Sequence, residues 1–141
     1  MKNLALIACL ALSGCYPALR TIQPETDVLV MAENGAPIEG AEVHIYSISN
    51  PHTRMENHVV SWSDKRGIAR FGRIRDWKLD APLMMHGLMV MHWDICASAP
   101  GMESSALYQL NKWEAGGKVS LVMKEAGEEE ESSCERFLTR R

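Results

Sequence analysis

The sequence lacks an excess of positive charge and, after its first residues, any long apolar run. Its 15 lysine and arginine residues stand against 18 aspartate and glutamate residues, a net charge of −3. A protein that binds nucleic acid usually carries a basic patch or stripe, so we expect no nucleic-acid partner. A helix needs about 20 apolar residues to cross a bilayer, and no segment after residue 15 reaches that length.

The motifs of common enzyme classes are also missing. The chain contains no Gly-x-Ser-x-Gly elbow, no His-Glu-x-x-His metal motif and no glycine-rich loop for phosphate. Its five histidines, among them His44, His58 and His92, are spread over different predicted strands and loops. Three histidines could still meet in space as a catalytic group. We predict a protein that is not an enzyme, with no catalytic residue and no cofactor, and keep a hydrolase as an alternative.

The first 15 residues have the layout of an export signal. Lys2 provides a positive start, and the apolar run from Leu4 to Leu12 is too short to cross a membrane. The run ends in Leu12-Ser13-Gly14-Cys15, which resembles the lipobox of bacterial lipoproteins. The resemblance implies that the chain is cut between Gly14 and Cys15 and that Cys15 carries a diacylglycerol and an N-acyl chain. The alternative is an ordinary cleaved signal with a coincidental cysteine.

The lipobox resemblance also implies a location and a domain plan. In diderm bacteria an aspartate after the lipidated cysteine tends to hold a lipoprotein at the inner membrane, whereas this chain has Tyr16. The resemblance therefore implies the periplasmic face of the outer membrane, contacted only through lipid. Without residues 1–14 the chain has 127 residues and a net charge of −4, enough for one domain. Residues 15–26 contain two prolines and no periodicity, which predicts a lipidated tether.

Two cysteines remain once the signal and the anchor are set aside. Cys9 lies in the discarded run and Cys15 would carry lipid, which leaves Cys96 and Cys134. An even remainder in an exported chain predicts one disulfide. It would close a loop of about 39 residues, for which the chain-entropy model gives roughly 4 kcal/mol of stabilisation. Two free thiols, or a bond to another chain, are the alternative.

Short apolar and β-branched segments, separated by turn signals, predict an all-β domain over residues 27–124. Asn34-Gly35 predicts a tight turn after the first strand. Gly67 predicts a second turn, which would close a hairpin between two short strands. Residues 104–113 suit either a strand or a helix. The expected strands are 27–32, 41–48, 59–62, 68–71, 88–97 and 118–124.

The stretch 84–92 is rich in methionine and histidine, which are copper ligands in oxidising compartments. On an extended strand, however, His86 and His92 would lie about 20 Å apart. Alternation along 88–97 also places Met91 on the face that we assign to the core. We therefore interpret the methionines as core filler and predict no metal site.

Two segments resemble the repeating pattern of carboxypeptidase regulatory-like, or transthyretin-like, domains. They are Asn-Gly-x-Pro-Ile-x-Gly-Ala-x-Val within residues 27–48 and Ser-Asp-x-x-Gly-x-Ala-x-Phe within 61–71, and Ala99-Pro100-Gly101 is similar to the corner that follows in this family. The resemblance implies an antiparallel β-sandwich of about seven strands and places 104–113 in a strand. One branch of the family hydrolyses 5-hydroxyisourate and ends in Tyr-Arg-Gly-Ser, whereas this chain ends in Leu138-Thr139-Arg140-Arg141.

Residues 72–87 depart from this pattern and predict a long exposed loop. Within it, Trp77 stands near Arg73 and Arg75, and tryptophan and arginine are enriched at binding hot spots. We predict that these three residues form a binding surface, the alternative being that Trp77 folds back over the sandwich. A second loop is expected at 49–58. The acidic residues 125–141 predict a flexible tail.

Together these features predict a lipid-anchored envelope protein that acts as a non-catalytic binding or scaffolding module. Its partner would be an envelope protein or a glycan. An alternative is an accessory lipoprotein subunit of a secretion or surface-assembly machine, since some such subunits share a transthyretin-like sandwich. A periplasmic hydrolase and a copper-binding protein are lesser alternatives.

Overall fold

The computed structural model describes residues 16–50, 53–80, 90–127 and 134. The signal-like residues 1–15 lie outside this part of the chain. The described residues are almost entirely β, and none of their helices is long and apolar enough to cross a bilayer. The elements are β1 (Tyr16–Gln23), β2 (Thr26–Ala32), β3 (Glu42–Asn50), β4 (Arg54–Trp62), β5 (Ile68–Phe71), β6 (Ile74–Asp80), β7 (Val90–Ser98), β8 (Ser105–Leu110), α2 (Lys112–Ala115) and β9 (Gly117–Met123).

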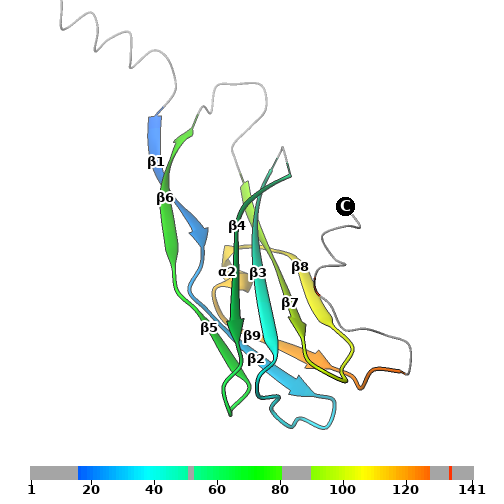
Figure 1. Ribbon diagram of the computed structural model, residues 1–141. Helices are drawn as coiled ribbons and strands as arrows, with labels where there is room; N and C mark the ends of the chain where they lie inside the picture. The colour runs from blue at the N-terminus through cyan, green and yellow to red at the C-terminus, as the bar shows by residue number, and fades with distance from the viewer. Residues whose placement is uncertain (1–15, 51–52, 81–89, 128–133, 135–141) are drawn as a thin grey trace, which may run out of the picture.

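Two sheets pack against each other as a β-sandwich (Figure 1). One has four antiparallel strands in the order β4-β3-β7-β8, and the other has three strands in the order β5-β2-β9. The predicted all-β sandwich is thus confirmed, and its sheets hold seven of the described strands. The β2–β9 pair is parallel, which departs from the expected antiparallel arrangement. The core includes Val28, Val30, Val43, Ile45, Phe71, Trp93, Ile95, Val119, Leu121 and Met123.

Alternation along the strands explains which side chains enter this core. In β9 every second residue is buried, so Val119, Leu121 and Met123 face inward. The central strands β3 and β7 bury both of their faces. On the side away from the core, Tyr46 and Ile48 form a second buried cluster with the two disulfide-bonded cysteines.

The hairpin predicted between residues 59–62 and 68–71 is wrong. These residues belong to β4 and β5, which lie in different sheets, so the turn between them is a corner of the sandwich. Ser63 fixes the corner, because its N–H donates to the Ala41 carbonyl at 3.0 Å. Gly67 has φ +74°, and a Cβ there would collide with the backbone of β2. Alternation identified both strands but carries no information on which sheet receives each of them.

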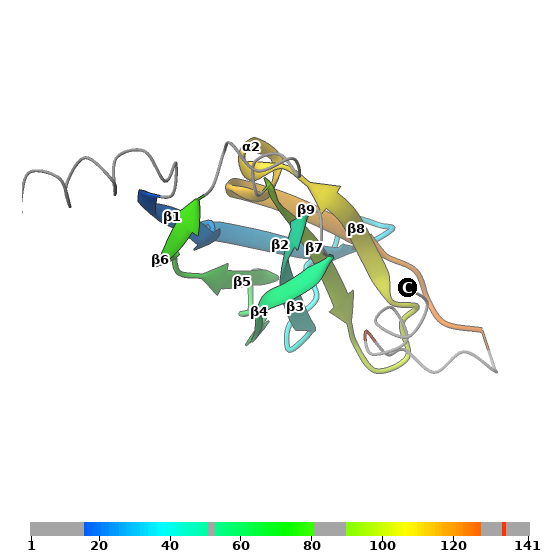
Figure 2. The ribbon, with the colours of Figure 1, turned by 90° about the horizontal axis from the view of Figure 1, so that it is seen from above.

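The tether predicted at residues 15–26 is also corrected. Residues 16–23 form β1, which pairs antiparallel with β6, and Ile22 and Gln23 are buried. Because β1 leads into β2 and β5 leads into β6, this two-stranded sheet prolongs the β2–β5 pair beyond the sandwich (Figures 1 and 2). We call β1 and β6 together the ribbon. Its two strands lie in segments that were expected to be a tether and a loop, so the sequence did not predict that they pair.

Two further predicted segments have other boundaries in the structure. The strand in 104–113 ends at Leu110, and a helical turn follows it. Asn111 caps this turn by accepting from the Trp113 and Glu114 N–H groups, while the Glu114 carboxylate accepts from the Asn111 N–H. The loop expected at 49–58 is mostly strand, since β3 runs to residue 50 and β4 begins at residue 54.

The predicted disulfide between Cys96 and Cys134 is confirmed. Cys134 is only 2% exposed and packs on the side of β3 and β7 that faces away from the core. Of the predicted tail, the structure describes residues 125–127 and Cys134. Glu125 makes an isolated β-bridge with Met102, so the start of this segment is paired with the folded domain.

Candidate functional site

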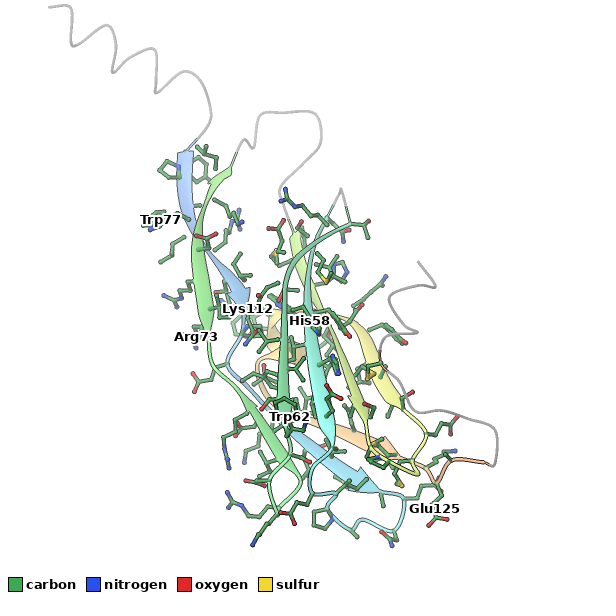
Figure 3. All side chains as sticks on the ribbon, in the orientation of Figure 1. His58, Trp62, Arg73, Trp77, Lys112 and Glu125 are labelled. Carbon is green, nitrogen blue, oxygen red and sulfur yellow. A yellow bond between two sulfur atoms is a disulfide. The ribbon has the colours of Figure 1, made fainter. Side chains whose placement is uncertain are left out.

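The three residues of the predicted binding surface lie on or beside the ribbon. Trp77 and Arg75 belong to β6, and Arg73 directly precedes it. Trp77 is 66% exposed and points away from the sandwich (Figure 3), so the alternative in which it folds back is wrong. Arg73 and Arg75 are exposed as well. The surface is therefore built on a paired strand rather than on a loop; residues 81–87 of the expected loop lie outside the described residues.

The strand register surrounds Trp77 with apolar residues that its position in the sequence does not reveal. Leu19 lies directly opposite Trp77, and Pro17 lies opposite Leu79. Successive pairs two residues apart share one face of a sheet, so these four residues form a continuous patch, which we call the apolar ribbon face. Leu19 is 48% exposed and Leu79 is 74% exposed. Apolar side chains that gather on the surface in this way indicate a contact with another body.

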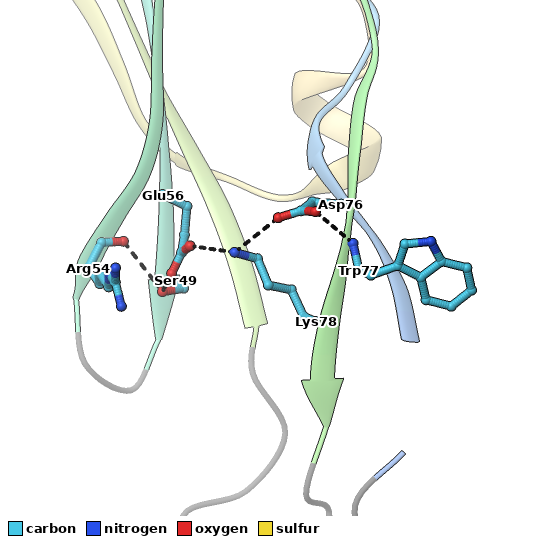
Figure 4. A network of polar contacts seen from close by, with 6 residues as sticks. All are labelled: Ser49, Arg54, Glu56, Asp76, Trp77 and Lys78. Carbon is cyan, nitrogen blue, oxygen red and sulfur yellow. Dashed lines mark hydrogen bonds and ion pairs between the residues drawn. The ribbon is translucent and has the colours of Figure 1, made fainter. Parts of the chain in front are cut away.

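The opposite face of the ribbon is charged and is bound to the sandwich. Lys78 Nζ lies 3.1 Å from Glu56 Oε2 on β4 and 3.4 Å from Asp76 Oδ2 (Figure 4). The Ser49 hydroxyl donates to Glu56 Oε1 at 2.9 Å. Figure 4 shows Lys78 and Trp77 leaving β6 on opposite sides. This ion pair orients the ribbon, because it leaves the apolar face turned outward.

The ion pair changes the pKa of both partners in the directions that stabilise the charged forms. The hydrogen bond from Ser49, assisted by Lys78, lowers the pKa of Glu56 below its ordinary value of 4.5. The hydrogen bond to Glu56 raises the pKa of Lys78 above its ordinary value of 10.5. The stabilisation from Glu56 is therefore present above pH 4.5 and is lost as the pH falls further, whereas that from Lys78 is present below pH 10.5 and is lost as the pH rises further.

We expect Glu56→Gln to lower the free energy of unfolding by about 1 kcal/mol at neutral pH, because it removes the carboxylate that binds Lys78. Urea denaturation measured across the pH range should show the difference from the wild type undiminished between about pH 5 and pH 10 and shrinking outside that window. Asp76→Asn is the control and should have a smaller effect, since Asp76 is exposed and its contact with Lys78 is longer. A difference that does not shrink as the pH falls below 4.5 would contradict the assignment.

A cluster of rings lies on the outward side of β3 and β4. His44 Nδ1 is 2.9 Å from His58 Nε2, and the Tyr46 hydroxyl is 3.3 Å from the same His44 nitrogen. The Tyr46 and His58 rings stack with their centroids 4.4 Å apart. Glu42 Oε1 lies 3.5 Å from His44 Nε2. The sequence signal was the alternation of Glu42, His44 and Tyr46 along one strand.

The cluster brings together two of the three histidines considered for catalysis. His92 does not join it, since its Nδ1 contacts Asn50 at 3.1 Å on another part of the sheet. The contact between His44 and His58 requires one ring to accept a hydrogen, so it cannot form when both rings are protonated. Among the described residues, no group of three histidine, cysteine, aspartate or glutamate side chains is arranged to hold a metal ion.

No protein-family model matches the chain, and no curated protein matches it either. Its function must therefore be inferred from its own residues. The most informative of these are the Cys96–Cys134 disulfide and the ribbon that begins directly after Cys15.

Proposed function

We propose that the chain is a lipid-anchored envelope protein whose β-sandwich acts as a non-catalytic binding or scaffolding module. Residues 1–14 direct export and are removed, and Cys15 carries the diacylglycerol and N-acyl chains. Two or more acyl chains make membrane attachment stable, whereas a single chain holds a protein only marginally. The anchored chain resides at the outer membrane, on its periplasmic side.

The Cys96–Cys134 disulfide is the observation that carries this proposal. Disulfides form and persist in oxidising compartments such as the periplasm and are rare in the cytosol. The bond joins residues 38 positions apart, and both cysteines are buried. A buried bond of this kind supports an exported protein, and export is the condition that the lipobox-like residues 12–15 require.

The binding role is supported by the surface at Trp77, Arg73 and Arg75. Trp77 is held on a strand whose backbone pairs with β1, so little conformational freedom is lost when a partner covers it. A tryptophan beside two arginines is typical of recognition. The two-sheet sandwich also supports the resemblance to transthyretin-like domains, a fold that hosts many unrelated functions.

We expect Cys15→Ala to abolish lipid labelling and to move the protein from the membrane fraction to the soluble fraction. Growth with labelled palmitate, followed by fractionation and immunoprecipitation, measures both effects. Cys9→Ala is the matched control, because Cys9 lies in the discarded run and its replacement should change neither result. A Cys15→Ala protein that keeps its label or stays with membranes would refute the anchor.

A second candidate is an accessory lipoprotein subunit of a secretion or surface-assembly machine, and the resemblance to transthyretin-like sandwiches favours it. A photo-crosslinking amino acid placed at Trp62, which is 63% exposed on β4, would distinguish the two. Capture of one stoichiometric assembly supports the subunit. Capture of glycan or of one separate envelope protein supports the binding module.

A further inference from the structure

We propose that the apolar ribbon face, formed by Pro17, Leu19, Trp77 and Leu79, lies on the bilayer that holds the lipid of Cys15. This inference rests on the proposed anchor and names the ligand of the predicted binding surface as a lipid surface. The sequence alone predicts contact with the membrane only through lipid, and this inference adds a direct contact between the protein and the bilayer.

Covalent geometry places the ribbon at the membrane. Tyr16 is the first residue of β1, and neighbouring Cα atoms along a chain are about 3.8 Å apart. Because β1 begins directly after Cys15, no free linker separates the acylated residue from the ribbon. Tyr16 pairs with Asp80, so this end of the ribbon includes both of its strands. Once the acyl chains enter the bilayer, the end of the ribbon has to lie at the headgroups.

The residues nearest that end have the chemistry of a membrane interface. Moving away from Cys15, the cross-strand pairs on the outward face are Pro17 with Leu79, Leu19 with Trp77, and Thr21 with Arg75. The side chains thus change from aliphatic through aromatic to cationic over about 13 Å of strand. Aliphatic groups favour the acyl region, tryptophan is enriched at the interface, and arginine is attracted to anionic headgroups.

The two faces of the ribbon differ in a way that selects one of them for the lipid. The inner face carries Lys78, whose ammonium group is bound to Glu56 on the sandwich. The outward face carries Leu79 at 74% and Trp77 at 66% exposure. A protein partner for these side chains would have to enter the headgroup layer beside the anchor, whereas lipid is already present there. Lipid is therefore the occupant that the position of the face favours.

Fluorescence quenching of the full lipidated protein in vesicles tests the contact. The vesicles contain phosphatidylethanolamine and phosphatidylglycerol, brominated near the headgroup end of the acyl chains. The protein has four tryptophans. Trp77→Phe should lower the quenching about two-fold, because it removes the residue at the lipid interface. Trp62→Phe is the matched control, since Trp62 is 63% exposed but lies on the sandwich far from the ribbon end (Figure 3), and it should not lower the quenched fraction.

A second variant tests the patch without relying on tryptophan alone. Leu79→Glu places a carboxylate on the same exposed face and should also lower the quenching of Trp77, while the Cys96–Cys134 disulfide, checked under non-reducing conditions, shows that the fold is retained. A photo-crosslinking amino acid at Trp77 should capture lipid in cells.

Equal quenching in the Trp77→Phe and Trp62→Phe proteins would overturn the inference. So would capture of a protein or glycan from position 77, which would make the ribbon a partner-binding surface. Palmitate labelling of the same preparation shows whether the lipid anchor itself or only the contact with the bilayer is wrong. A labelled protein without Trp77 quenching refutes the bilayer contact and leaves the anchor intact, whereas an unlabelled protein refutes both.

Discussion

Replacing Cys134 with alanine should lower the free energy of unfolding by about 4 kcal/mol. The disulfide restricts the unfolded chain, and the loop that it closes spans 38 positions. Cys134 also packs with Tyr46 and Ile48, so its loss opens a buried cluster. Urea denaturation of the purified protein, followed by circular dichroism, measures the change.

The controls for this prediction remove the same disulfide in other ways. Cys96→Ala and the Cys96→Ala/Cys134→Ala double variant should each cost about as much as the single change at Cys134, because all three remove the same bond. Wild-type protein under reductant should behave in the same way. A loss below about 1 kcal/mol would show that the disulfide contributes little to the stability of the sandwich.

Trp93→Ala should lower the free energy of unfolding by about 3 to 5 kcal/mol. Trp93 is 2% exposed in the middle of the sandwich, so the change leaves a large cavity. Its Nε1 group also donates to the Ile22 carbonyl at 2.8 Å, which ties the end of β1 to β7. The same denaturation experiment measures the loss.

Two further variants serve as comparisons. One separates the packing of Trp93 from its hydrogen bond, and the other replaces an exposed tryptophan. Trp93→Phe keeps most of the ring but leaves the buried Ile22 carbonyl without this donor, and it should cost about 1 to 3 kcal/mol. Trp62→Ala, at a 63% exposed position, should change stability by no more than about 0.5 kcal/mol. If Trp93→Ala were no more damaging than Trp62→Ala, the assignment of Trp93 to the core would fail.

Local sequence patterns were sufficient to predict most of the strands of the sandwich. The strands expected at 27–32, 41–48 and 118–124 correspond to β2, β3 and β9. Counting the cysteines predicted the disulfide. The strand predictions succeeded because the signal for a strand lies in residues one or two positions apart along the chain.

Pairing over long distances in the sequence could not be predicted in this way. The partner of β1, β6, is more than 50 positions away, so β1 is stabilised by contacts that no local pattern reveals. The same limit explains why Trp77 was identified as an exposed candidate but Leu19 and Leu79 were not, since only the strand register places them beside it. The Asn111-x-x-Glu114 capping box, in contrast, was visible in the sequence and was overlooked.

The continuity of β1 with β2 determines how the protein would bear mechanical load. The link between them is held by two hydrogen bonds to the junction of α2 and β9, because the Glu25 carbonyl accepts from the Gly117 N–H and the Thr26 hydroxyl donates to the Ala115 carbonyl. Tension applied at the amino-terminal end therefore runs lengthwise along β1 and into the middle strand of the β5-β2-β9 sheet. Ladder hydrogen bonds lie across the strands, so such a pull shears many of them at once instead of unzipping them singly.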